Sequence, residues 1–405
     1  MKLIQHAAGV LAAFTLVAGT AAAAEKMYGP GVSDTEIKIG NTNPYSGPAS
    51  SYGTIGKALT AYWNMVNAAG GINGRKIEFI SLDDGYSPPK TKEQVRKLVE
   101  SDEVFALFQT LGTPTNSAVH QYVNKKEVPH LFVATGATKW GDPQSFPWTM
   151  GWQPNYQTEG RIYANYLLKN KPDAKVAILY QNDDYGKDYV KGFKDGLGDK
   201  AASMIIAEES YEVTDPTVDS QIVNLKASGA DTFYNVTIPK FAAQAIRKAY
   251  DIGWRPLHLL NSVSASIKST LEPAGLEKSQ GIITTVYLKD PSDPAWKDDP
   301  EYKEWLAFMD KWYPEGDKSN PFNVYGYAVS QTLRHVLEKC GDDLTRENLM
   351  KQAASIQGLK VKMLLPGITV NTSANDFYPI EAMQMQKFEG QEWIRFGEII
   401  SAESS

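Results

Sequence analysis

The sequence predicts an α/β protein made of two doubly wound lobes, each a parallel sheet covered by helices on both faces. One unit recurs along the 405 residues: a short apolar strand, a loop of Gly, Ser, Thr, Asn and Asp, and then an amphipathic helix. Strands that alternate with helices of about 10–15 residues are typical of parallel sheets. The unit recurs in two runs, near residues 30–150 and 151–282, and each run predicts one lobe.

In the first run, strands are expected at residues 36–40, 76–84, 104–109 and 129–134. The helix after the first strand has the clearest pattern, because its apolar residues recur every three or four positions and a glycine pair ends it. These residues are Ile55, Leu59, Tyr62, Val66, Ala69, Gly70 and Gly71. The next helical stretch begins at Pro88, and proline is well tolerated in the first turn of a helix.

In the second run, strands are expected at residues 175–181, 231–236 and 257–261. The helices between and after them are expected at residues 187–198, 217–229, 240–253 and 262–272. The remaining chain has two long helical stretches, 301–313 and 324–340, and a hairpin-like end at 381–399. We expect these last pieces to return and complete both lobes.

The first 24 residues have the pattern of a cleaved export signal. Lys2 supplies the basic start, residues 7–19 form an apolar middle, and four alanines precede Glu25. This apolar stretch is shorter than the roughly 18 residues that indicate a membrane helix, and no later stretch reaches that length. No cysteine follows the small residues to carry a lipid anchor. A buried N-terminal helix is the alternative; we expect an exported, free protein.

Charge and cysteine content exclude several classes of partner and of stabilising bond. The formal net charge of −6 argues against nucleic acid or an anionic membrane as partner. Cys340 is the only cysteine, so an intramolecular disulfide is impossible. Stability must therefore come from burial in two sizeable cores.

The sequence lacks the common motifs of phosphate, metal and nucleophile sites. It contains no G-x-x-x-x-G-K-[ST] loop, no G-x-G-x-x-G after a strand, no H-E-x-x-H pair and no G-x-S-x-G elbow. No metal-ligand spacing is present among the histidines, which are His6, His120, His130, His258 and His335. Paired aspartates at 82–86 and 182–186 are also ordinary turn and cap residues. We expect no catalysis, no cofactor and no metal.

Six loops follow predicted strands and are candidates for a ligand site: 43–53, 110–116, 134–139, 182–186, 237–239 and 261–264. In open parallel sheets, ligands bind beyond the carboxyl ends of the strands. Gly112, Thr113 and residues 134–138 are small residues at turns, where backbone amides can face an anion. Two such loops on one lobe suit a carboxylate that is held without arginine. Tight connectors are the alternative.

Five motifs in order along nearly the whole chain after the export signal carry a family resemblance. They are IKIG…PYSGPASSYG, NAAGGINGRKIEFISLDDGYSP, VPHLFVATGAT, ILYQNDDYGKDY and QIVNLKASGADTFYNV. With them the sequence resembles the type I periplasmic binding proteins of the leucine/isoleucine/valine-binding protein family. The resemblance implies the substrate-binding subunit of an ABC importer, whose two lobes close on a small ligand and deliver it to an inner-membrane permease. It implies a periplasmic location, and we expect a monomer that does not insert into the membrane.

The resemblance also implies a three-crossing hinge between the lobes. We expect the export signal at residues 1–24, the first lobe at 30–150 plus 283–362, and the second lobe at 151–282 plus 363–400.

The first-lobe loops that match the family's carboxylate grip contain five candidate residues. They are Gly112 and Thr113 in one loop, and Ala134, Thr135 and Gly136 in the other. Gly112 stands where the family usually has serine, so backbone amides are expected to do more of the binding.

The other candidates lie around the rest of the expected cleft. Tyr52 would wall the side-chain pocket, and Tyr185 would face it from the second lobe, unless it only packs over its helix start. Thr237 and Ile238 stand in place of an aromatic residue of the family. Asn261 and Ser262 stand where amino-acid binders place a carboxylate. An ammonium desolvated without a counter-charge is costly. The resemblance and this departure together predict a carboxylate ligand that lacks an α-amino group.

The aromatic residues near these loops suit a flat ring, such as that of a phenylpropanoid or benzoate-type acid. They are Tyr45, Tyr52, Trp140 and Tyr185. Aromatic side chains also bind aliphatic ligands, so a binder of branched-chain amino acids is one alternative. A ligand-sensing domain of the same fold is another.

Overall fold

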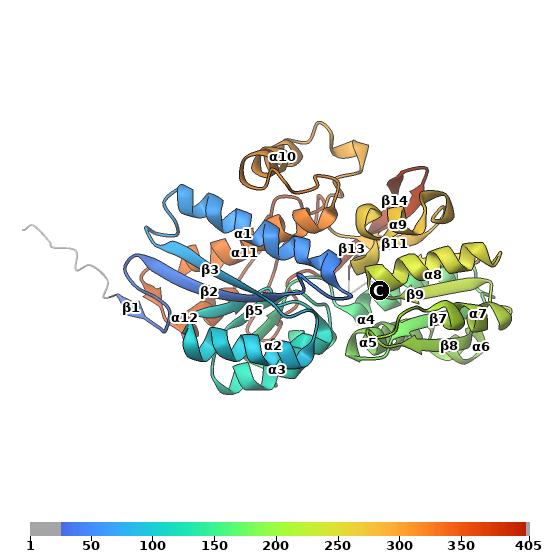
Figure 1. The fold of residues 1–405 in the computed structure, drawn as a ribbon, viewed down its shortest axis with the longest axis horizontal. Coiled ribbons are helices and arrows are strands. Elements are labelled where there is room, and N and C mark those ends of the chain that lie inside the picture. Colours follow the sequence, from blue (N-terminus) through green and yellow to red (C-terminus); the bar gives the residue numbers. More distant parts are fainter. Residues whose placement is uncertain (1–25, 402–405) are drawn as a thin grey trace, which may run out of the picture.

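The computed structural model describes residues 26–401, and the export signal predicted at residues 1–24 lies outside them. In the described part, the strands form two large sheets and one small pair. Figure 1 shows the two large sheets at opposite ends of an elongated molecule, with helices above and below each. The predicted α/β fold with two doubly wound lobes is confirmed.

The first sheet has five parallel strands in the order β3-β2-β4-β5-β6. They are β2 (Glu36–Asn43), β3 (Lys76–Asp83), β4 (Ala106–Phe108), β5 (His130–Val133) and β6 (Thr149–Gly151). Strand β2 runs three residues beyond its predicted end, because its polar last residues still pair with β3. The sequence does not predict β6, since three residues carry no alternation to read.

Helices cover both faces of this sheet. Helices α1 (Gly53–Ala68) and α11 (Pro321–Cys340) pack together on one face, and α2 (Pro88–Arg96) and α3 (Thr113–Lys125) lie on the other (Figure 1). The remaining elements of this lobe are α10 (Pro300–Trp312), α12 (Arg346–Ala353) and the parallel pair β1 (Met27–Tyr28) and β12 (Asp343–Leu344).

The second sheet has seven strands in the order β14-β13-β11-β10-β9-β7-β8. The parallel strands are β7 (Val176–Gln181), β8 (Ile205–Tyr211), β9 (Thr232–Val236), β10 (Leu257–Leu260) and β11 (Ile283–Val286). The antiparallel hairpin is β13 (Ala382–Glu389) and β14 (Glu392–Ser401). The helices are α4 (Tyr156–Asn170), α5 (Asp184–Leu197), α6 (Ala201–Met204), α7 (Asp219–Ala227), α8 (Pro239–Asp251) and α9 (Glu272–Ala274).

Short irregular helical turns complete the described elements. The 3₁₀ turns are Ser50–Tyr52, Thr138–Gly141, Gly198–Lys200, Ser262–Ser264, Leu276–Lys278 and Pro294–Trp296. The π-helical turns are Lys97–Ser101 and Ile267–Leu271. The single helix expected at residues 262–272 is therefore wrong: a 3₁₀ turn and a π turn replace it, and the side chain of Ser266 caps the second turn.

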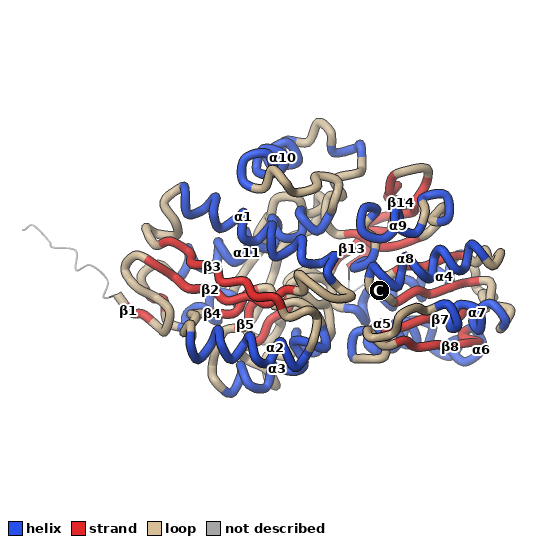
Figure 2. The backbone as a smooth tube through the Cα atoms, in the orientation of Figure 1, coloured by secondary structure: helices blue, strands red, loops and turns tan. Residues whose placement is uncertain are grey.

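The chain passes between the two sheets three times, after β6, after β11 and before β13. The sequence assigns residues 283–362 to the first lobe, but their first four residues form β11, which pairs with β10 and β13. The second crossing therefore begins after Val286, because the buried strand "ITTV" continues the second sheet. Figure 2 shows loop segments gathered between the two sets of strands.

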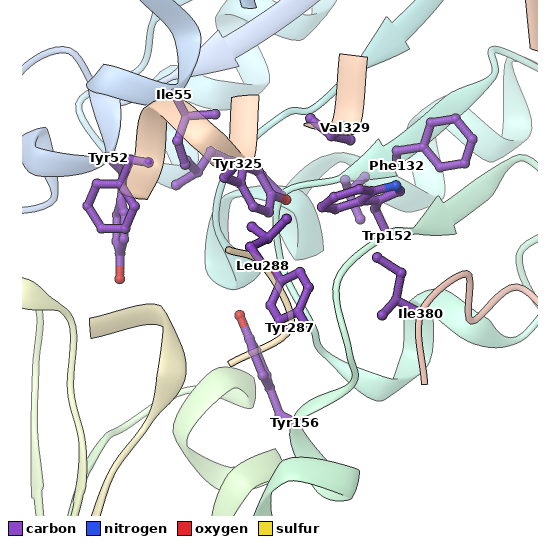
Figure 3. Close-up of a cluster of buried hydrophobic side chains, with 14 of the residues drawn as sticks. Tyr52, Ile55, Phe132, Trp152, Tyr156, Tyr287, Leu288, Tyr325, Val329 and Ile380 are labelled. Atoms are coloured by element: carbon purple, nitrogen blue, oxygen red, sulfur yellow. The ribbon is translucent and has the colours of Figure 1, made fainter. Parts of the chain in front are cut away.

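One apolar cluster runs from the first lobe through the crossings into the second. On the crossings, the rings of Trp152 and Tyr287 lie 6.2 Å apart, and Trp152 also meets Tyr325 of α11 at 5.3 Å. Figure 3 shows these side chains pointing toward one another between the lobes. Within residues 26–401, no helix combines the length and the apolar character needed to cross a membrane.

Candidate ligand-binding site

A cavity of about 120 Å³ lies between the lobes, at the carboxyl ends of the parallel strands. Its wall is built by the loops after β2, β3, β4 and β5 of the first lobe and after β7, β9 and β10 of the second. The crossings and the start of α11 complete the wall. Ligands of open parallel sheets bind at this edge, and the volume holds several waters or a small organic molecule.

A wider surface groove of about 460 Å³ lies beside α10. Several charged side chains of this groove are already paired with one another, since Lys362 pairs with Glu304 and Arg334 pairs with Glu338. Residues of the second sheet do not line it. The cavity between the lobes is therefore the better candidate for a ligand site.

Six of the ten residues that the sequence predicts for the site line this cavity. They are Tyr52, Gly112, Thr113, Ala134, Tyr185 and Ser262. The other four, Thr135, Gly136, Thr237 and Asn261, do not line it.

Three of these four support residues of the wall. The hydroxyls of Thr135 and Thr113 lie 2.6 Å apart. Asn261 donates a hydrogen bond of 2.8 Å from Nδ2 to the hydroxyl of Tyr185, and its Oδ1 accepts from the amide of Thr237. The carbonyl oxygen of Gly136 accepts from the amide of Tyr156, which holds the start of α4.

The backbone amides expected to hold a carboxylate are mostly engaged within the protein. The amide of Gly112 donates to the carbonyl oxygen of Ala134, and the amide of Ala134 donates to the carbonyl oxygen of Thr110. The amide of Thr135 donates to the carbonyl of Val133. The expected grip by the amides of Gly112 and Ala134 is thus not available here, and Thr113, the first residue of α3, is the next residue of this loop that lines the cavity.

Tyr52 forms part of the cavity wall and also contacts the opposite lobe. Its hydroxyl donates a hydrogen bond of 3.0 Å to the carbonyl of Val263, and its ring lies 5.1 Å from that of Phe322. Figure 3 shows its hydroxyl pointing away from α1. Burial raises the pKa of Tyr52, so the group is a neutral donor.

The sequence misses most of the aromatic wall. The missed residues are Tyr86, Tyr156, Tyr287, Phe322 and Tyr325. They come from the loop after β3, from the crossings and from α4 and α11, which only tertiary packing brings beside the predicted loops. Among these, Tyr156 stands next to the predicted Tyr185, with ring centroids 5.3 Å apart.

Two aromatic residues expected near the ligand are elsewhere. The hydroxyl of Tyr45 hydrogen-bonds with that of Ser81, and Tyr45 does not line the cavity. Trp140 is buried against His120, with ring centroids 5.1 Å apart, and its Nε1 reaches Thr135. Both expectations are wrong, because each side chain packs within its own lobe.

The charged part of the wall comes from the second crossing. Lys289 lies 2.8 Å from both Asp299 and Glu301, so its charge is already paired. Asp290 accepts hydrogen bonds from the amide and hydroxyl of Ser292, and burial raises the pKa of this carboxyl. In the described residues of the wall, Asp290 is thus the acidic group and no lysine or arginine is left unpaired.

Comparison with known proteins gives the family of this chain. A model described as "Periplasmic binding protein" matches residues 36–392. The chain belongs to the periplasmic binding protein family. The predicted family is confirmed.

Relatives of this binding protein fall in the predicted group. Leu/Ile/Val-binding protein homolog 1 of Brucella abortus (strain 2308) is 26% identical over 339 residues, which are 82% of this chain and 86% of the relative. Leu/Ile/Val-binding protein homolog 7 of Brucella suis biovar 1 (strain 1330) is 23% identical over 348 residues, 83% and 86% of the two chains.

Solved structures share the fold of this binding protein. A branched-chain amino acid ABC transporter from Thermus thermophilus with bound valine has a TM-score of 0.81 at 14% identity, covering 91% of this chain and 97% of that one. A fatty acid ABC transporter substrate-binding protein from Thermomonospora curvata has a TM-score of 0.78 at 22% identity, covering 94% and 97%.

A buried carboxylate that the sequence does not predict stands behind the cavity wall of this binding protein. Glu159 of α4 is 1% exposed, and its Oε1 accepts a hydrogen bond of 2.7 Å from the amide of Ser262. Its Oε2 accepts from the hydroxyls of Ser262 at 2.8 Å and Tyr189 at 2.6 Å. The hydroxyl of Tyr163 shares its proton between Oε1 and the carbonyl of Leu260.

Among residues 26–401, no lysine, arginine or histidine forms an ion pair with Glu159. Burial raises the pKa of this carboxyl, and its hydrogen-bond donors act in the opposite direction. One sequence signal could have found it, since Glu159 stands four residues before Tyr163 on the buried face of α4. The second lobe therefore supplies a carboxylate next to loop 261–264, but from a helix instead of from the loop.

Proposed function

We propose that this protein is the exported substrate-binding subunit of an ABC importer, and that its ligand is a small organic carboxylate with an aromatic or other apolar body. The observation that carries the proposal is the cavity between two lobes, whose wall is mainly tyrosine and aliphatic side chains from both. The relatives are named as binding or transport proteins, which favours binding over catalysis.

The carboxylate would lie at the first turn of α3. Thr113 offers its hydroxyl and its amide at the start of a 13-residue helix, where the helix dipole favours an anion, and Pro114 after it has no N–H to donate. Lys289 is already paired with two carboxylates. The uncharged donors at the start of α3 are therefore the groups of the wall that we assign to the anion.

The apolar body would occupy the tyrosine-rich part of the wall. Tyr86, Tyr156, Tyr185 and Tyr325 suit an aromatic acid that lacks an α-amino group. The donors around Glu159 occupy its oxygens, and Ser262 stands between it and the cavity, so an ammonium does not reach it directly. A branched-chain amino acid is the second candidate, because Asp290 of the wall could face an ammonium.

The proposal includes the cell compartment and the partner. The protein would be exported to the periplasm through a cleaved signal at residues 1–24, act as a monomer and dock on an inner-membrane permease. Its lobes would be residues 30–150 and 151–282, each completed by part of the remaining chain, with β11 belonging to the second.

Calorimetric titration with matched ligands tests the proposal. The panel contains 3-phenylpropanoate, its primary amide and its alcohol, together with leucine and valine. We expect the carboxylate to bind at least about tenfold more tightly than its amide, because each charge-assisted hydrogen bond contributes about 1.5–3 kcal/mol. Equal binding of acid and amide would contradict the carboxylate site, and tight binding of leucine or valine alone would favour the second candidate.

A further inference from the structure

Ser262 is held against Glu159 by two separate hydrogen bonds. Its amide donates to Oε1 at 2.7 Å and its hydroxyl donates to Oε2 at 2.8 Å. The residue is half-buried and lines the cavity. Its side chain therefore has one orientation, set from behind the wall by α4.

In this orientation, the number of hydrogen bonds that a serine hydroxyl can donate and accept determines which ligand groups it can bind. The group has one proton to donate and two lone pairs that accept. The amide of Ser262 and the hydroxyls of Tyr163, Tyr189 and Ser262 all lie within hydrogen-bond distance of the two oxygens of Glu159, and when Glu159 accepts all four, the proton of Ser262 points at Oε2. In the described part of the chain, no protein donor reaches the lone pairs of Ser262 Oγ, which stay open toward the cavity.

We infer that the ligand carries a hydrogen-bond donor, an O–H or N–H group, in addition to its carboxylate, and that Ser262 accepts a hydrogen bond from it. The inference rests on the proposed function, since it places this donor on the same ligand. Ser262 is thus a specificity-determining residue, and Glu159 is a positioning residue that sets its polarity.

The two hydrogen bonds to Glu159 fix Ser262 Oγ as an acceptor toward the cavity, and this polarity favours a ligand donor and disfavours a second acceptor at the wall. A plain hydrocarbon at this place would leave the lone pairs of Ser262 unsatisfied in a closed site, which is also unfavourable.

Two matched ligand sets test the inference by calorimetric titration of the full protein. One set is 4-methylpentanoate, 2-hydroxy-4-methylpentanoate and leucine, which present hydrogen, hydroxyl and ammonium at the same carbon. The other is 3-phenylpropanoate and 3-(4-hydroxyphenyl)propanoate, which differ by one distal hydroxyl. We expect a donor-bearing member of at least one set to bind about tenfold more tightly than its plain acid. The member that gains shows whether the donor is a hydroxyl or an amine.

Two substitutions separate the roles of the two residues. Ser262→Ala removes the acceptor, so the donor-bearing ligand should lose its advantage. In Glu159→Gln, the amide nitrogen can donate to the hydroxyls of Ser262 and Tyr189, which frees the proton of Ser262 to face the cavity. The advantage should then shrink or reverse. The matched controls are Ser220→Ala and Glu209→Gln, two changes outside the cavity wall. Both controls should retain the affinity advantage of the donor-bearing ligand.

The readout is a ratio of affinities, which does not depend on the fraction of folded protein. If plain and donor-bearing acids bind equally, or if the advantage survives Ser262→Ala, the inference is overturned and the proposed function stands. If no acid in either set binds, or if amides bind as well as acids, the proposed function fails and the inference falls with it.

Discussion

The hydroxyl of Tyr52 on the first lobe donates a hydrogen bond of 3.0 Å to the carbonyl oxygen of Val263 on the second. Tyr52 is 7% exposed and its ring packs against Phe322, so one side chain lines the cavity and joins its two walls. The lobes therefore touch across the candidate ligand site in this conformation.

Removal of this hydroxyl should weaken ligand binding without changing the fold. In Tyr52→Phe the ring contacts stay and the contact to Val263 is lost, so affinity should fall about fivefold, the equivalent of about 1 kcal/mol. Tyr52→Ala also removes the packing on Phe322 and should cost clearly more. Calorimetric titration measures both, with circular dichroism as the check on folding. Unchanged affinity in Tyr52→Ala would exclude Tyr52 from the site.

Thr113→Val should reduce the affinity for carboxylates at least about tenfold, because the side-chain donor at the start of α3 is replaced by a methyl group of similar size. The matched control is Thr60→Val in α1, whose hydroxyl donates to the carbonyl of Gly56 outside the cavity wall. Titration of acid and amide pairs measures the effect. If Thr113→Val weakens acid and amide equally, Thr113 does not contact the carboxylate.

Contacts between the lobes also lie outside the cavity, at Asp188 of α5. This carboxylate accepts hydrogen bonds from the amide of Thr138 at 2.6 Å and from its hydroxyl at 2.8 Å. Asp188→Ala removes both, so the open form should gain population and ligand should dissociate several-fold faster. Stopped-flow fluorescence gives the rate, and small-angle scattering gives the radius of gyration. Asp195→Ala on the same helix, which loses only a surface pair with Lys191, should behave as wild type.

Buried histidines should make the protein less stable in mild acid. Burial lowers the pKa of His130 and His258 to about 3, below the ordinary value of 6.5. Between those values the unfolded chain binds a proton that the folded protein does not, so stability is present above pH 6.5 and is lost as pH falls below it. Each histidine should lower the free energy of unfolding by about 1 kcal/mol between pH 7 and pH 5.5.

Urea unfolding at both pH values measures this slope. His258→Gln should reduce it, because glutamine keeps an acceptor for Asn235, whose Nδ2 lies 3.2 Å from His258 Nε2, and does not titrate. An unchanged slope in this variant would show that His258 is not the source.

Local pattern was enough for the strands and helices that carry a clear period. The helix with Ile55, Leu59 and Tyr62 at regular spacing is α1, and the apolar runs that end at Gln109 and Gln181 contain β4 and β7. The short strand β6 and the 3₁₀ and π turns within residues 262–271 could not be predicted from the sequence. Such short elements depend on pairing and capping more than on a local pattern.

The sequence by itself determined the fold class and most of the loops that meet at the cavity, because periodicity and turn residues are local properties of the chain, and its motifs indicated the family by resemblance. Only the tertiary structure decided which groups are free for a ligand. The amides of Gly112 and Ala134 are engaged, Tyr45 and Trp140 pack elsewhere, and Glu159 approaches Ser262 from another helix. Whether a polar group has its partner depends on residues distant in the chain, and packing alone brings them together.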